Sequence, residues 1–294
     1  MFITNLFNVS DLKEMKNAGF DAVIIGSTFF SIGMPLCLEI DEIKKIHKEA
    51  KELGLAIYVS YNCMIFDEEI EQLKSELSAL KEIDVEGIYY SDLAIYTLGK
   101  ELGITAKLIF APGFILANTA DTKAYLAQGI KQVELANELT LEEKIEIGKA
   151  CTTGIQVAIH GYLVMSYSRR MLLENYFAEV GIELESKQDF NFHLIEETRE
   201  NPMPILETEK GVLIFSPYIL ESFEEIEQLM NSGIHFFRIE GVFLGKEYVI
   251  DAIKAYRDIL NGSDKKEVKH AFYQKYKDKI HASGFYYQKT NLVK

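Results

Sequence analysis

Short apolar runs recur along the chain, each a few residues after a glycine that follows a polar helical stretch. Examples are NAG-FDAVIIG at Gly19, ELG-LAIYVS at Gly54 and NSG-IHFFRIE at Gly233. Glycine closes a helix in the left-handed conformation without steric cost. The run that follows is typical of a parallel strand buried on both faces. The pattern predicts eight strands, near residues 2–4, 22–26, 55–60, 86–90, 107–111, 131–135, 155–159 and 234–239.

Eight strands alternating with helices favour an α/β fold, a (β/α)8 TIM-type barrel. A doubly wound open sheet is the alternative, but no GxGxxG or GxxxxGK[ST] supports a nucleotide-binding version of it. Two helix starts fit the capping box S/T-x-x-E, one at Thr140 with Glu143 and one at Ser222 with Glu225.

The spacing between the glycines of the repeated helix–glycine–strand unit is much longer at one place. Gly129 and Gly154 are 25 residues apart, whereas Gly154 and Gly233 are 79 apart. We therefore expect a barrel over residues 1–262, with an insertion after strand 7 at about 161–232. Long excursions at the carboxyl ends of barrel strands are where such folds carry function.

The C-terminal segment, residues 263–294, differs in composition from the barrel. It carries eight Lys against three acidic residues, a local charge of +5, and it is rich in Tyr and Phe. Two interpretations stay open: a basic aromatic extension packed on the barrel, or a contact with RNA or a partner.

Composition restricts the function classes. Hydrophobic residues make up 48% and charged residues 26% of the chain, as in soluble globular proteins. No apolar run approaches the roughly 20 residues of a membrane span, and the N-terminus does not resemble a signal peptide, so we expect a cytoplasmic protein. The net charge of −14 opposes RNA binding by the whole surface. RNA contact would have to use the basic C-terminal segment or a basic partner.

The three cysteines, Cys37, Cys63 and Cys151, are far apart and form no CxxC pair. We expect them to be buried structural thiols. No HExxH or clustered His predicts a metal site, and no GxSxG predicts a serine hydrolase.

Side chains just past the barrel strands should face an active site. The residues at these positions are Ser27, Tyr61, Asn62, Ser91, Asp92, Glu134, His160, Arg238 and Glu240. His160 and Glu240 are the catalytic candidates, and Asn62, Asp92, Glu134 and Arg238 are candidates for substrate binding.

Each strong candidate has a plainer alternative. His160 ends a buried strand and is either a general acid/base or a hydrogen-bonded structural residue. Arg238 and Glu240 are two residues apart on one strand face, and either hold a polar substrate or form a structural ion pair. Tyr167 and Arg170, in the insertion, are two further candidates for substrate binding and are expected to reach over the barrel mouth. An Arg at this place could clamp an anion or simply face solvent.

The stretch HGYLVMSYSRRMLL, with the preceding IQVAIHG, resembles the signature of the collagenase-like peptidase family U-32, roughly E-x-F-x-x-G-[SA]-x-C-x-x-x-x-G-x-C. The resemblance extends to VELANELTLEEKIEI before it. It continues into HFFRIEGVFLGKEYVIDAIKAYRDIL, which is similar to the family's KIEGR-containing unit, and into HASGFYYQKT.

The departures from this signature concern the cysteines. The two signature thiols fall on Val164 and Met171, the signature Glu on Gln156, its Phe on Ala158, and the Arg of KIEGR on Val242. The resemblance implies that members with the full cysteine set hold an iron–sulfur cluster. A cluster needs thiolate ligands, so we expect no cofactor on this chain alone and an iron–sulfur cluster only in a cysteine-containing partner.

The family is linked, despite its name, to oxygen-independent hydroxylation of tRNA, rRNA or ubiquinone precursors. This short chain resembles the shorter of two bacterial paralogues implicated in prephenate-dependent 5-hydroxylation of the tRNA wobble uridine. The resemblance implies three partners: a longer cysteine-containing homologue, tRNA through the complex, and a small carboxylate such as prephenate. A collagenase-like peptidase (a hydrolase) and a non-catalytic small-molecule-binding barrel remain the alternatives.

Overall fold

Eight parallel strands close into a barrel. The computed structural model describes residues 1–151, 153–182, 192–195, 197 and 201–288. Each strand pairs with the next along the chain, and the eighth, β12, pairs with both β8 and β1. The barrel strands are β1 (Phe2–Asn5), β2 (Ala22–Ser27), β4 (Ala56–Tyr61), β5 (Gly87–Tyr90), β6 (Leu108–Phe110), β7 (Gln132–Glu134), β8 (Ile155–Ser168) and β12 (Phe236–Ile239). The predicted TIM-type fold is confirmed, and all eight predicted strands form.

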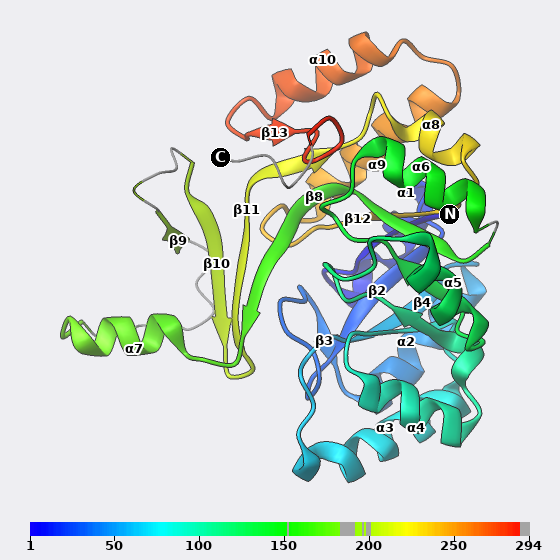
Figure 1. Cartoon of the computed structure of the whole chain (residues 1–294), viewed down its shortest axis with the longest axis vertical. Helices are drawn as coiled ribbons and strands as arrows, with labels where there is room; N and C mark the ends of the chain where they lie inside the picture. Colours follow the sequence, from blue (N-terminus) through cyan, green and yellow to red (C-terminus); the bar gives the residue numbers. More distant parts are fainter. Residues whose placement is uncertain (152, 183–191, 196, 198–200, 289–294) are drawn as a thin grey trace.

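Helices follow the strands and cover the outside of the barrel (Figure 1). They are α1 (Leu12–Ala18), α2 (Ile40–Glu52), α3 (Ile70–Ile83), α4 (Leu93–Leu102), α5 (Thr119–Ala127), α6 (Leu141–Ala150), α8 (Ile226–Asn231) and α9 (Lys246–Leu260). Short 3-10 helices span Val9–Asp11, Asp67–Glu69 and Thr105–Lys107, and the two-residue strand β3 (Cys37–Leu38) pairs with β2. Among the described residues, no helix is long and apolar enough to cross a membrane.

Alternate residues of neighbouring strands fill the barrel interior. Ile3, Ile24, Tyr58, Tyr89 and Ile109 belong to one buried cluster inside the sheet. Gly87 makes room for these large side chains, because a Cβ at this position would lie 2.8 Å from Ile109 Cδ1 and 3.0 Å from Tyr58 Cδ1. The barrel interior is therefore a packed core, and barrels of this type bind their ligands at the carboxyl ends of the strands.

The insertion after the seventh barrel strand is an antiparallel arm. Strand β8 continues past the barrel to Ser168 and pairs with β11 (Gly211–Glu221), which pairs with β10 (Met203–Thr208). Helix α7 (Leu172–Glu179) and strand β9 (His193–Leu194) complete the arm. Figure 1 shows this arm leaving the barrel, with α7 projecting at its far end.

The C-terminal segment packs on the barrel over its described part, which ends at residue 288. Helix α10 (Lys265–Lys275) lies against α9, and β13 (His281–Ala282) pairs with β11. Phe272 and Tyr286 are buried in the main core. Residues 289–294 of the predicted segment lie outside the described residues.

Three lysines in the described part of this segment form ion pairs with carboxylates outside the segment. Lys265 pairs with Glu227, and Lys275 pairs with Asp251. Lys269 Nζ lies 2.8 Å from Glu221 Oε1 and 2.7 Å from Glu224 Oε1. Much of the predicted local charge is thus balanced by the barrel.

One of the two predicted capping boxes forms. Thr140 Oγ1 accepts from Glu143 N at 3.2 Å, and Glu143 Oε2 accepts from Thr140 N at 2.8 Å, at the start of α6. The box predicted at Ser222 and Glu225 is wrong. Ser222 Oγ instead donates to the Ile159 carbonyl at 2.8 Å, so this side chain joins the arm to the barrel and α8 begins only at Ile226.

The expectation of three buried thiols is wrong for one of them. Cys63 and Cys151 are buried, whereas Cys37 is exposed. Cys37 lies on β3, a short edge strand outside the barrel, where one side of the backbone faces solvent.

Candidate active site at the barrel mouth

A cavity of about 310 Å³ opens at the carboxyl ends of the strands, between the barrel and the arm. Its size is at the lower end of the range for small-molecule sites. Six of the eight predicted site residues line it: Asn62, Asp92, Glu134, Tyr167, Arg238 and Glu240. The other two, His160 and Arg170, are not among its lining residues. Of the further strand-end residues, Ser91 lines the cavity, whereas Ser27 and Tyr61 donate hydrogen bonds to Glu76.

Arg238 lies between two carboxylates on the cavity floor. Its Nε is 3.0 Å from Glu134 Oε2, and its Nη1 is 3.5 Å from Glu240 Oε2. The Glu134 side chain is 1% exposed and that of Arg238 is 22% exposed. Burial alone would lower the pKa of the Arg238 guanidinium, but the two carboxylates outweigh it and raise that pKa. Arg238 is therefore a permanent cation at the centre of the site.

Glu240 is positioned by the backbone after β12. Its Oε1 accepts from Gly241 N at 3.0 Å and Val242 N at 3.3 Å. Burial raises the pKa of the Glu240 carboxyl, although Arg238 opposes the shift. A carboxyl group with a raised pKa can exchange a proton closer to neutral pH than an exposed one.

A hydrogen-bonded chain behind the cavity supports Glu134. Tyr89 OH donates to Gln156 Oε1 at 2.8 Å, and Gln156 Nε2 donates to Glu134 Oε2 at 2.6 Å. Sequence reasoning missed Tyr89 as a cavity residue and Gln156 as the support of Glu134. A polar Gln inside the apolar run IQVAI was the available signal, because a buried amide needs a partner.

Asn62 and Asp92 hold loops at the rim. Asn62 exchanges two hydrogen bonds of 2.9 Å with the backbone of Ile32. Asp92 caps helix α4 by accepting from Ala94 N at 2.9 Å, and its other oxygen accepts from Ile65 N at 3.1 Å. These contacts shape the mouth of the cavity.

The arm contributes one predicted residue to the cavity wall. Tyr167 OH donates to the Lys210 carbonyl at 3.0 Å and accepts from Met64 N at 3.5 Å. Burial and the neighbouring Cys63 raise the pKa of Tyr167 to about 12. Arg170 is exposed and is not among the residues that line the cavity, so its predicted place in the wall of the mouth is wrong.

The prediction that His160 lies in the barrel mouth is also wrong. The register between β12 and β8 pairs Arg238 with Ala158 and then Ile239 with His160, so β8 holds one extra residue, Ile159. Such a bulge turns the next side chain to the other face of the strand. His160 therefore points outward, toward α9.

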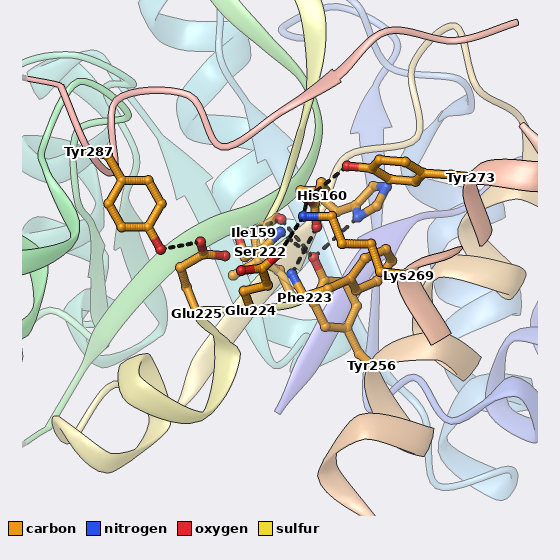
Figure 2. Close-up of polar contacts among 11 residues, drawn as sticks. Ile159, His160, Ser222, Phe223, Glu224, Glu225, Tyr256, Lys269, Tyr273 and Tyr287 are labelled. Carbon is orange, nitrogen blue, oxygen red and sulfur yellow. Dashed lines mark hydrogen bonds and ion pairs between the residues drawn. The ribbon is translucent and has the colours of Figure 1, made fainter. Parts of the chain in front are cut away.

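Its ring is fully buried and packs against Tyr248 and Tyr256 of α9, and Figure 2 shows it beside Tyr256. The Nε2 atom lies 2.9 Å from Tyr248 OH and the Nδ1 atom 3.2 Å from Tyr256 OH. Tyr256 OH itself donates to the Ile159 carbonyl at 2.9 Å, so His160 Nδ1–H is the donor to it. Burial, with a smaller contribution from His281, holds the pKa of His160 well below its ordinary value. The geometry gives His160 a structural role, and its catalytic role stays a prediction.

A second polar cluster attaches the C-terminal segment next to His160 (Figure 2). Tyr273 OH donates to Glu221 Oε1 at 2.9 Å, and Tyr287 OH donates to Glu225 Oε1 at 2.7 Å. The segment thus closes the outer side of β8 and β11, away from the cavity.

The residues at the signature positions do not fit an iron–sulfur cluster. Val164 lines the cavity and is 36% exposed, and Met171 immediately precedes α7. Neither side chain supplies a thiolate. Within the described residues, no group of three or more His, Cys, Asp or Glu side chains is placed to hold a metal ion.

Several known proteins are similar to this chain. "tRNA hydroxylation protein P2" of Bacillus subtilis (strain 168) is 26% identical over 257 residues, which cover 86% of this chain and 83% of that protein. "tRNA hydroxylation protein P1" of the same strain is 25% identical over 260 residues, 86% of this chain but 61% of that longer protein. The solved structure of the U32 peptidase Mk0906 has a TM-score of 0.51 at 15% identity, over 81% of this chain and 91% of that one, and it supports the fold alone.

The resemblance seen in the signature region holds along the whole chain. The sequence model of peptidase family U32 matches residues 7–292. Nearly every element described above lies within this match, including the barrel, the arm and the packed C-terminal segment. We conclude that this chain belongs to peptidase family U32.

Proposed function

We propose that this protein is a cluster-less subunit of a tRNA hydroxylation system. In this proposal it works with a longer, cysteine-containing homologue in the prephenate-dependent 5-hydroxylation of the wobble uridine. The longer subunit carries the iron–sulfur cluster, and the barrel mouth of this chain contributes a ligand site. Work on tRNA implies a cytoplasmic location.

One observation carries the proposal. The wall of the cavity holds Val164 where the resembling family has a cysteine, while the polar centre of Arg238, Glu134 and Glu240 is intact. A chain that lost the thiolates but kept a buried, charged pocket fits a partner subunit better than an independent redox enzyme. The length agrees, since the chain spans 83% of the shorter relative and 61% of the longer one.

The charge distribution bears on how tRNA is bound. The chain has a net charge of −14, and three lysines of its basic segment are paired with carboxylates. Because phosphate contacts need free cationic side chains, the proposal assigns most of the tRNA contact to the partner.

Nucleoside analysis of tRNA tests the proposal. A strain lacking this gene should lose hydroxylated wobble uridine, and the wild-type gene should restore it. Glu240→Gln should restore it poorly, whereas Glu101→Gln, on the exposed face of α4, should restore it fully. Unchanged nucleosides in the deletion strain would refute the proposed function.

A further inference from the structure

Most of the charged residues that line the barrel-mouth cavity are acidic. Of the described residues that line it, Arg238 is basic, whereas Asp92, Glu134 and Glu240 are acidic. The single guanidinium is already shared between Glu134 at 3.0 Å and Glu240 at 3.5 Å. The cavity floor therefore has no positive charge in excess.

A ligand carboxylate would be repelled by the two carboxylates that flank Arg238. To pair with Arg238 it would have to share a guanidinium whose charge Glu134 and Glu240 already offset. Glu240 is held in place there, because its other oxygen accepts from the backbone N–H groups of Gly241 and Val242. If Glu240 stayed in place, a further carboxylate would be added to a partly buried site. Like charges at short range in a poorly solvated site repel strongly.

A ligand group that donates hydrogen bonds would interact favourably with the carboxylates of the cavity floor. Carboxylate oxygens accept hydrogen bonds and, when ionised, donate none. The remaining lining is largely apolar or aromatic and includes Ile24, Met34, Tyr89, Phe114, Val164 and Phe215. The cavity thus combines an apolar wall with an acceptor-rich, negatively charged floor.

We propose that this cavity binds a molecule with a planar apolar body and a neutral or cationic donor head, such as an amine or amide, and rejects carboxylates. The proposal rests on the proposed function only for the premise that the cavity takes a ligand. If this cavity rejects carboxylates, the small carboxylate that the family resemblance implies binds on another subunit of the complex.

Three probes that differ only in their polar end test the selectivity. Tyramine, 2-(4-hydroxyphenyl)ethanol and 4-hydroxyphenylacetate share one ring and end in an ammonium, a hydroxyl and a carboxylate. Titration calorimetry on the full chain at neutral pH and low salt should give the amine and the alcohol at least about ten-fold lower Kd values than the acid. Equal or tighter binding of the acid overturns the proposal, as does failure of all three to bind at millimolar concentration.

A variant pair assigns the selectivity to the cavity floor. Glu240→Gln removes one negative charge beside Arg238 and should narrow the ratio of the acid and amine Kd values. Glu76→Gln is the control, since Glu76 is a buried carboxylate that accepts from Ser27 and Tyr61 and does not line this cavity. A ratio that is unchanged in Glu240→Gln contradicts the proposal.

The probe titrations test the ligand selectivity and the tRNA analysis tests the proposed function, so either proposal can be refuted without the other. Selective binding together with unchanged tRNA nucleosides in the deletion strain would refute the proposed function alone. Lost hydroxylation together with preferred binding of the acid would refute the selectivity alone.

Discussion

Arg238→Met is the most informative single perturbation of the site. It removes the guanidinium that lies 3.0 Å from Glu134 and 3.5 Å from Glu240, while a methionine fills part of the space of the arginine stem. The two carboxylates are then left together in a poorly solvated position. The change therefore measures what the central cation contributes to the folded state.

The magnitude follows from burial. Removal of one partner of a buried ion pair costs about 3–5 kcal/mol, because the other charge stays buried without compensation. The Glu134 side chain is 1% exposed, but the Arg238 side chain is 22% exposed, so water already screens part of the pair. We expect the lower end, about 3 kcal/mol near pH 8.

The loss should depend on pH in a defined direction. In the variant, Glu240 loses the cation that lowers its pKa, while its burial and the charge of Glu134 remain. Its folded-state pKa, already raised, therefore moves further above the unfolded value of about 4.3. The folded state then keeps a proton that the unfolded state releases, and stability falls as the pH rises. One such proton gives at most about 1.4 kcal/mol per pH unit. The difference from wild type should be small near pH 5 and approach its full size about two units higher.

Urea unfolding followed by far-UV circular dichroism, at about pH 5, 6.5 and 8, covers this window. Lys74→Met is the matched control, since its pair with Glu101 is 3.2 Å long but exposed, and it should cost under about 1 kcal/mol without a pH trend. The double variant Arg238→Met/Glu134→Gln should recover more than half of the loss. An equal loss for Arg238→Met at all three pH values, or no recovery in the double variant, would refute the reasoning.

Four further predictions follow from the same structure. Because burial depresses the pKa of His160, the wild-type protein should lose stability as the pH falls below about 6.5. The His160→Gln variant should lose less stability over that range, by up to about 1.4 kcal/mol per pH unit. Urea midpoints that fall in parallel in both proteins would contradict this prediction. Lys265, Lys269 and Lys275 are already paired with carboxylates of the same chain. Changing all three to Gln should therefore alter the slope of log K against log salt concentration, for tRNA binding by the complex, by less than about 1. A fall of about 2 or more in the size of this slope, measured by fluorescence anisotropy, would show that these lysines contact phosphates. Protein purified without oxygen should show neither iron–sulfur absorption nor stoichiometric iron, and about four irons per chain after reconstitution would overturn the expectation. Casein, gelatin and collagen should remain uncleaved by pure protein, and time-dependent cleavage that disappears in Glu240→Gln would restore the peptidase interpretation.

The sequence by itself determined the barrel. The repeated glycine and apolar run placed all eight strands, because a strand buried on both faces needs a continuous apolar segment and a helix end needs a left-handed residue. It also located the charged residues that line the cavity, Asp92, Glu134, Arg238 and Glu240. Parallel strands in a barrel all deliver their carboxyl ends to one face, so Glu134, Arg238 and Glu240 could be grouped without knowledge of any distance.

Only the tertiary structure decided the direction of individual side chains. One extra residue in β8 turns His160 away from the cavity, and a bulge of this kind depends on pairing between strands far apart in the sequence. The use of Ser222 to join β8 rather than to cap α8 is likewise a long-range contact that local patterns do not encode. The same holds for the sharing of Arg238 between two carboxylates, which sets the charge of the cavity. Periodicity reports which face of an element is buried, whereas register and pairing, which arise only when the barrel closes, decide what each buried polar group contacts.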